Sequence, residues 1–404
     1  MSKCENALAA ILRRSEQSRP QHARHSVTRV HLVVACGVAT AFLAGSASAQ
    51  QARRIALRPP DAVSAERFTQ VTSVRELRDG GLLAADQAEG RLVLVRWVSA
   101  EATAIGRAGS GPGEYRGVGW LYALSGDSTM LTDSYVGRWL LLDGPRIVAT
   151  VVEQNTLNRL LPSQLSGADE LGHVLGARGE VFSGRAPRTR DTADSLVLLM
   201  AGRAAQRVDT IAWLKGRGGD GFHVGQRDSG RPPFISVSNP LASEDQALLF
   251  RDGWIAVARV GPYRVDWRSP EGRWVRGAPL PFTAVRVDDR ERCLAMERVL
   301  GGGGACDPSS LPGWPETAPP FLPPSLQRLA PALLAAPDGR LVIARTPSVA
   351  SPERQYDVVD RQSRLVAVIS TGPSEVLIGF GVRSAYTLST SDLGVQTLRR
   401  HAWP

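Results

Sequence analysis

The residues best suited to catalysis are few and far apart in this sequence. Beyond the N-terminal leader described below, the histidines are His173, His223 and His401, and no two of them have the spacing of a metal-binding pair. A Ser-His-acid triad is arithmetically open, but no Gly-x-Ser-x-Gly segment positions a serine nucleophile. We therefore assign no catalytic residue and interpret each histidine as a surface or packing residue.

A glycine-rich segment, Gly106 to Tyr115, is the next candidate for chemistry, because glycine-rich loops can hold phosphate groups. A nucleotide loop would end in Lys-Ser/Thr at the start of a helix, and this segment has neither feature. Its glycines permit positive φ angles and a tight crossing, and Pro112 fixes one step of the turn. We interpret it as a structural linker, with a weaker copy at Gly216 to Phe222.

The N-terminus has the order of a signal peptide. Arg24 and Arg29 precede the apolar run Val30 to Ala44, and the small residues Ala47 to Ala49 follow it. The run is shorter than the roughly 20 residues that span a bilayer. We predict a signal peptide over residues 1–49, with a translation start near Val27 as an alternative, and a mature domain over 50–404 that is secreted or periplasmic.

Removal of the predicted leader determines which cysteines remain in the mature chain. Cys4 and Cys36 would leave with it, so Cys293 and Cys306 remain as a predicted structural disulfide in an oxidising compartment. Lipidation of Cys36 is the alternative, but the apolar stretch before it, Val30 to Val34, is short for export. No histidine lies near the remaining pair to complete a metal site, and we assign no metal ligand.

The charge pattern excludes several partners. The formal net charge is +9, from 48 basic and 39 acidic residues, and the leader carries part of this excess. The basic residues alternate with acidic ones and form no concentrated stripe, which a nucleic-acid-binding face requires. We expect no nucleic acid, no stable membrane anchor and a monomer; the protein or small-molecule ligand stays unidentified.

Internal repetition indicates the fold. Paired apolar runs with β-branched residues or period-two alternation recur along the chain, and each pair predicts a β-hairpin. The pairs are Gly81 to Ala85 with Arg91 to Trp97, Ser128 to Thr132 with Arg138 to Leu142, Trp254 to Ala258 with Tyr263 to Trp267, and Arg340 to Ala344 with Tyr356 to Val359.

The repeat unit has the length of a propeller blade. An Asp-Gly or Gly-Asp turn opens the first strand of each pair, and the pattern recurs after roughly 45 residues. One further unit fits Glu170 to Lys215, lengthened by a polar loop around Ala186 to Ala193. With no long helical pattern between the strands, the sequence predicts an all-β fold: a six-bladed β-propeller with four-stranded antiparallel blades.

An insertion at about residues 285–330 separates the fourth and fifth units. Asp288 to Val299 has the composition of a helix with one apolar stripe, and Gly301 to Pro324 is too rich in glycine and proline for a regular element. Cys293 and Cys306 both fall in this insertion. Their disulfide would lower the conformational entropy of an otherwise loose excursion.

Gly106 to Tyr115, with the strands that end at Asp133 and Asp143, resembles the six-bladed propellers of the NHL-like and TolB-like group, which includes exported bacterial members. The resemblance covers most of the mature chain as a pattern, and it implies that the glycine-rich motif links the outer strand of one blade to the inner strand of the next. It also implies a binding role more often than chemistry.

The same resemblance implies an alternative. Some six-bladed propellers hold calcium at the mouth of the central channel and open lactones there, and Asp86, Asp133 and Asp209 stand near strand ends where oxygen ligands can gather. The competing interpretation is that aspartates at strand ends accept hydrogen bonds from turn amides. We assign no cofactor and leave calcium open.

The tryptophans fit a structural role. Trp97, Trp139, Trp213, Trp254 and Trp267 occur once or twice per repeat, and we interpret them as packing residues between blades rather than as a sugar-binding face.

The sequence thus predicts a binding or scaffolding module without assigned chemistry, with a calcium-dependent hydrolase or lactonase as the alternative. We also expect Arg54 to Leu57 to be the outer strand of the last blade, pairing with Gln396 to Ala402 and closing the ring.

Overall fold

The computed structural model of the chain describes residues 52–133, 138–152, 165–179, 195–202, 208–216, 221–223, 236–300, 306–307, 309, 313–326 and 330–403. The predicted leader, the polar loop around 186–193 and most of the second glycine-rich segment lie outside these residues. Within the described ranges, no helix is long and apolar enough to cross a membrane.

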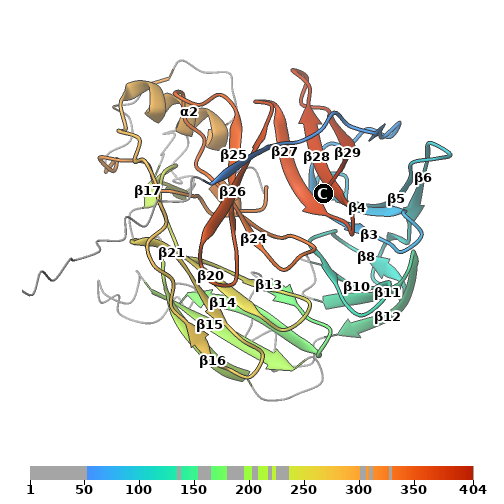
Figure 1. Cartoon of the computed structure of the whole chain (residues 1–404). Coiled ribbons are helices and arrows are strands. Elements are labelled where there is room, and N and C mark those ends of the chain that lie inside the picture. Colours follow the sequence, from blue (N-terminus) through green and yellow to red (C-terminus); the bar gives the residue numbers. More distant parts are fainter. Residues whose placement is uncertain are drawn as a thin grey trace, which may run out of the picture. The chain divides into compact units, whose positions relative to one another are not determined.

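The chain folds into a six-bladed β-propeller of four-stranded antiparallel blades, as predicted (Figure 1). The strands of blades one to three are β3 (Val71–Glu76), β4 (Leu82–Asp86), β5 (Arg91–Arg96) and β6 (Glu101–Ile105); β9 (Leu121–Ala123), β10 (Ser128–Asp133), β11 (Arg138–Asp143) and β12 (Arg146–Val152); and β13 (Leu165–Ala168), β14 (His173–Gly179), β15 (Ser195–Gly202) and β16 (Val208–Lys215).

Blades four to six are built in the same order. Their strands are β19 (Gln246–Leu249), β20 (Ile255–Val260), β21 (Tyr263–Arg268) and β22 (Trp274–Val275); β23 (Leu333–Ala335), β24 (Leu341–Ala344), β25 (Arg354–Val359) and β26 (Leu365–Thr371); and β27 (Glu375–Phe380), β28 (Ser384–Thr390), β29 (Gln396–Ala402) and β2 (Ala62–Val63). The inner strands β3, β9, β13, β19, β23 and β27 contact one another in a closed ring.

The four predicted hairpins are confirmed as β4/β5, β10/β11, β20/β21 and β24/β25. The turns before their first strands contain the glycines noted in the sequence. Gly80, Gly126, Gly253 and Gly339 have φ angles of 80°, 63°, 84° and 81°. Other residues rarely adopt such angles, so the Asp-Gly and Gly-Asp pairs reverse the chain at equivalent places in four blades.

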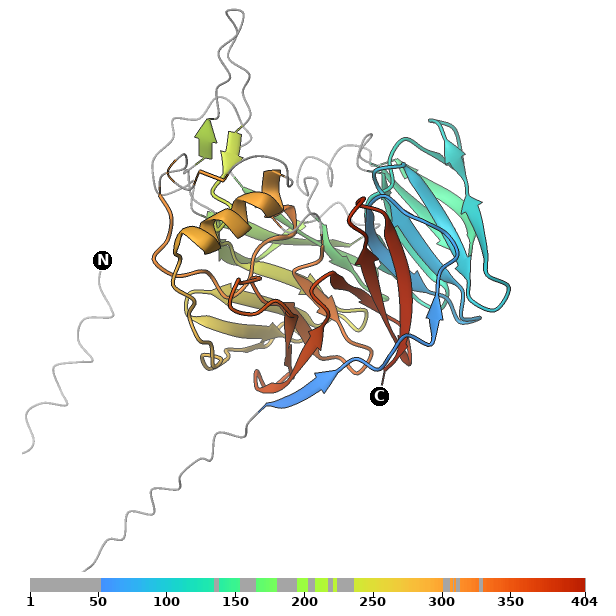
Figure 2. The same cartoon turned by 90° about the horizontal axis from the view of Figure 1, so that it is seen from above.

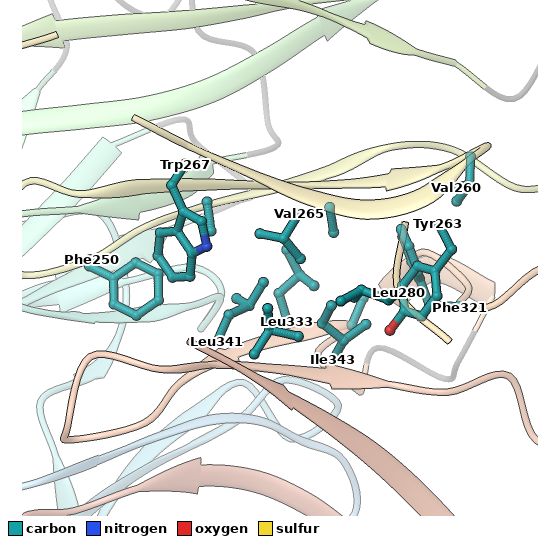
Figure 3. Close-up of a cluster of buried hydrophobic side chains, with 14 residues drawn as sticks. Phe250, Val260, Tyr263, Val265, Trp267, Leu280, Phe321, Leu333, Leu341 and Ile343 are labelled. Carbon is teal, nitrogen blue, oxygen red and sulfur yellow. The ribbon is translucent and has the colours of Figure 1, made fainter. Parts of the chain in front are cut away.

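Apolar side chains fill the layers between neighbouring blades. Between blades four and five, Trp267 of β21 packs with Leu341 and Ile343 of β24, all fully buried (Figure 3). Each blade is covered on both faces by its neighbours, which explains why a central strand such as β4 is buried along its whole length.

The tryptophans bear out the packing interpretation with one exception. Trp267 and Trp139 are buried, and Trp254 packs against the cluster around Trp267. Trp97 stacks on Tyr386 with ring centroids 6.0 Å apart. Trp213 is 60% exposed, so its assignment to the core was wrong; it lies on β16, the outermost strand of its sheet.

The prediction that Arg54 to Leu57 form the outer strand of the last blade is wrong. Instead of joining the last blade, β1 (Arg53–Ala56) pairs in parallel with β26 of blade five (Figure 2). The next strand, β2, pairs with Arg399 and Arg400 of β29 in blade six. Pro59 and Pro60 follow β1 and lack backbone N–H donors, so the chain leaves blade five there and reaches the next blade.

The insertion contains the predicted helix and disulfide. Helix α2 (Asp289–Leu300) begins after Asp288, whose carboxylate caps it by accepting hydrogen bonds from the N–H groups of Arg290 and Glu291 at 3.0 Å. A disulfide joins Cys293 of this helix to Cys306. A 3-10 turn, η3 (Pro324–Leu326), lies later in the insertion.

Shorter strands complete the description. Two short pairs stand outside the blades: β7 (Arg107–Ala108) with β8 (Glu114–Tyr115), and β17 (Gly221–His223) with β18 (Ser236–Ser238).

Candidate functional site

The glycine-rich segment is a linker, as predicted. It joins β6, the outer strand of blade one, to β9, the inner strand of blade two. The Glu114 carboxylate accepts a hydrogen bond from the Gly111 N–H at 2.8 Å, and a Cβ on Gly109 would come within 2.1 Å of that carboxylate. Arg138 donates to the carbonyl oxygens of Gly109, Ser110 and Glu114. The polar groups of this loop thus form hydrogen bonds that stabilise the conformation of the loop itself.

Asp86 and Asp133 serve as anchors for their own blades. Asp86 accepts hydrogen bonds from the backbone N–H groups of Thr69 and Gln70, both at 3.0 Å, just before the inner strand β3. Asp133 accepts from those of Arg116 and Gly117 at 2.9 and 3.0 Å, ahead of β9. Both side chains are fully buried, and their oxygens accept hydrogen bonds from these backbone N–H groups.

The remaining candidates do not come together. Asp209 is exposed on the outer strand β16. His401 is buried in blade six, with Nε2 2.8 Å from Thr387 Oγ1 and Nδ1 2.7 Å from the Arg58 carbonyl oxygen. His173 lies 2.8 Å from Asp169 on blade three. The side chain of His223 lies outside the described residues. In the described part of the chain, no three His, Cys, Asp or Glu side chains group as a metal site.

A cavity of about 440 Å³ is lined by residues at the starts of β3 and β27 and by Ala330, which precedes β23. Blades one, five and six and helix α2 all contribute to its walls. Segments that are far apart in the sequence therefore meet here, and the cavity has the size of small-molecule sites in proteins, roughly 300–1,000 Å³.

One part of the lining is apolar and well ordered by packing. Val71 of β3, Ile378 of β27 and Leu388 of β28 are buried in the core between blades six and one, and each also faces the cavity. Val376 and Leu294 extend this apolar surface. Gln396 stands beside it; its side-chain oxygen accepts a hydrogen bond from the Val71 N–H at 2.8 Å across the seam between the last and first blades.

The other part of the lining is charged. Arg298 of α2 and Arg354 of β25 both face the cavity, and Glu297 is exposed beside them. Burial, followed by the positive charge of Arg354, lowers the pKa of Arg298 to about 10, against the opposing effect of Glu291. Arg298 therefore remains protonated at neutral pH and is repelled by the positive charge of Arg354.

Helix α2 is held over blade five by a buried carboxylate. Glu291 accepts hydrogen bonds from Ser348 Oγ at 2.6 Å and from the Val349 N–H at 2.9 Å, in the loop between β24 and β25. Ala295 of the helix packs with Leu322 and Leu241 in a separate apolar cluster. These contacts fix the helix face that carries Leu294, Glu297 and Arg298.

This site was not predicted from the sequence. The helix and the disulfide were predicted there, but the insertion was given only a structural role. The signal available was the pattern of α2: Leu294 and Arg298 are four residues apart and so lie on one helix face, with a charge beside an apolar residue. Nothing in the sequence connected that face with Arg354 on another blade.

The solved structures that resemble this chain in fold include proteins of low sequence identity. No family model and no curated protein matches the chain. Among solved structures, the calcium-binding protein regucalcin from Agrobacterium tumefaciens is 11% identical, covering 87% of this chain and 97% of its own, with a TM-score of 0.37. Virginiamycin B lyase from Staphylococcus aureus is 8% identical, with 85% and 98% covered and a TM-score of 0.39. A luciferin-regenerating enzyme is 12% identical, with 85% and 95% covered and a TM-score of 0.40. At such distances the function must be argued from the residues of this chain.

Proposed function

We propose that this protein is an exported binding module that takes a small ligand in the cavity beneath α2. The observation that carries the proposal is the cavity itself: about 440 Å³, lined by three blades and by the insertion. Its apolar floor and a few convergent polar groups are the composition of ligand sites in general.

The insertion supports a binding role because it departs from the repeat where the cavity lies. A propeller blade needs no helix, yet α2 supplies one wall and is fixed by the Cys293–Cys306 disulfide and by Glu291. The disulfide and the signal-like leader together support an exported location.

The alternative of a calcium-dependent hydrolase gains no specific support from this site. Glu297 is the one carboxylate among the described lining residues, and a calcium ion takes six to eight oxygen ligands. We therefore propose binding without chemistry.

To test this proposal, we would measure binding of a neutral apolar fluorophore, N-phenyl-1-naphthylamine, to the original protein and to a variant whose cavity is filled. Ser374 is exposed and lines the cavity, so Ser374→Trp should occupy it and lower fluorophore affinity at least tenfold. The matched control is Ser125→Trp, since Ser125 is also exposed, lies in the turn between β9 and β10 and is not part of the lining. Binding that is absent from the original protein, or that survives Ser374→Trp unchanged, contradicts the proposal.

A further inference from the structure

The charged wall of the cavity narrows the class of ligand. Two guanidinium groups, Arg298 and Arg354, line a space in which one carboxylate, Glu297, lies among the described residues. The remaining described polar groups in the lining are neutral, such as Gln70, Ser374 and Thr390. The described part of the lining therefore carries a net positive charge.

Arg354 has unused hydrogen-bonding capacity. Its Nε is buried and has no hydrogen-bond partner among the described residues. A buried donor without a partner is costly, and the cost is removed when a ligand acceptor reaches it. Guanidinium groups match the paired oxygens of a carboxylate or phosphate, which makes an oxyanion the natural acceptor.

The position of Arg298 points to the same chemistry. Burial and then the positive charge of Arg354 disfavour the charged form of Arg298, and an anion bound by both arginines would reduce their repulsion. Glu291 opposes this effect on Arg298, and it also accepts hydrogen bonds from the loop of blade five.

The apolar part of the lining indicates that the rest of the ligand is apolar. Val71, Val376, Ile378 and Leu388 come from β3, β27 and β28, whereas the guanidinium groups come from α2 and β25. A ligand that fills the cavity meets both surfaces at once.

We propose that the ligand is a small amphipathic anion, whose carboxylate or phosphate group is bound by Arg298 and Arg354 and whose apolar body lies on Val71, Val376, Ile378 and Leu388. This inference rests on the proposed binding function and adds the ligand class to it.

The experiment compares four probes with the same chain: octanoate, octyl phosphate, 1-octanol and octylammonium. Isothermal titration on the purified full chain should show octanoate or octyl phosphate binding at least tenfold more tightly than 1-octanol, and octylammonium most weakly. The ratio between the two anions distinguishes a carboxylate ligand from a phosphate ligand. Equal affinity for 1-octanol and both anions, or no binding of either anion, overturns the inference.

Two variants locate the effect. Arg298→Gln and Arg354→Gln should each weaken binding of the preferred anion about tenfold and leave 1-octanol within about twofold. Arg340→Gln is the matched control, since Arg340 lies on blade five, pairs with Asp338 at 3.2 Å and is outside the lining. Undiminished anion affinity in both cavity variants overturns the assignment of these arginines.

The result separates this inference from the proposed function. If the neutral fluorophore binds and Ser374→Trp blocks it, but the anions show no preference, the cavity is a ligand site and the anionic class is wrong. If neither fluorophore nor anion binds, both proposals fail. A variant that does not fold leaves the comparison of the four probes on the original chain as the deciding measurement.

Discussion

Blades one and two and blades four and five carry opposite charges at the same position of the repeat. In the first two, the second strand ends with Asp86 or Asp133. In the other two, an arginine stands next to that end: Arg259 is the last residue but one of β20, and Arg345 directly follows β24. In every case an acid–arginine pair connects the second and third strands. Asp133 pairs with Arg138 at 3.0 Å, and Arg345 pairs with Asp357 at 2.6 Å.

The backbone that enters each blade explains the difference. In blades one and two the aspartate accepts the N–H groups of the incoming segment, which an arginine cannot do. In blade four the acid lies on the incoming segment itself: Asp245 accepts from the Val260 N–H at 3.0 Å and pairs with Arg259 at 2.9 Å. The repeated feature is therefore an arginine paired with a buried acid beside the end of the second strand, and the position that bears each charge can change.

The largest effect is expected from Asp133→Ala. This change leaves Arg138, whose side chain is 9% exposed, without its carboxylate and removes the acceptor for two backbone N–H groups. We expect a loss of about 3–5 kcal/mol of unfolding free energy, measured by urea denaturation. The control Asp143→Ala removes an exposed ion pair and should cost less than about 0.5 kcal/mol. Similar losses in the two variants would contradict the anchoring role.

Arg345→Met tests the opposite arrangement in blade five. Asp357 would lose both hydrogen bonds from Arg345 and keep the one from the Tyr263 hydroxyl at 2.7 Å. Because one partner remains, we expect a loss of about 2–3 kcal/mol, again by urea denaturation. A loss as large as that of Asp133→Ala would show that the hydroxyl does not support the acid.

Asp86→Asn should have a smaller effect. An amide keeps one oxygen for the N–H groups of Thr69 and Gln70, so one acceptor is lost, together with the 3.8 Å pairing to Arg91. We expect about 1–2 kcal/mol of destabilisation in the same assay. No measurable change would mean that the carboxylate is not needed to hold the entrance to blade one.

The smallest effect concerns pH. Burial raises the pKa of Asp266, but hydrogen bonds from Arg264, Arg259 and the Gly277 N–H outweigh it and hold the pKa below the usual value of 3.8. The stabilisation is therefore complete above the unfolded-state pKa and is lost as the pH falls through the lower folded-state value.

Thermal melts should show this dependence. The difference in Tm between the original chain and Asp266→Asn should be constant near neutral pH and shrink below about pH 4. Asp143→Asn serves as the exposed control. A difference that stays constant down to about pH 2 would contradict the role assigned to Asp266.

The sequence was sufficient for the blades because their signals are local. Turn glycines such as Gly80 and Gly253 and the alternation of the flanking strands depend on a few neighbouring residues. Ring closure was harder, since β2 has only two residues and its partners are in the last strand. Pro59 and Pro60 mark the break after β1, but the sequence does not say which blade accepts each piece.

The cavity could not be predicted for a related reason. Arg298 and Arg354 belong to an insertion and to a repeat strand, and only the packing of α2 on blade five brings them into one space. In the sequence each resembles the many arginines that pair with nearby acids. Trp213 shows the converse error: a large apolar residue in a strand suggested the core, but the strand is an outer one.

The pairing of β2 with β29 can form only late in the synthesis of the chain, because the two strands lie near its opposite ends. The Ser64 hydroxyl accepts a hydrogen bond from the Leu398 N–H, and 334 positions separate these residues in the sequence. Protein synthesis usually proceeds at 5–20 residues per second, so Leu398 is added to the chain roughly 20 to 70 s after Ser64. During that interval β29 does not yet exist, so β2 has no partner strand and blade six is incomplete.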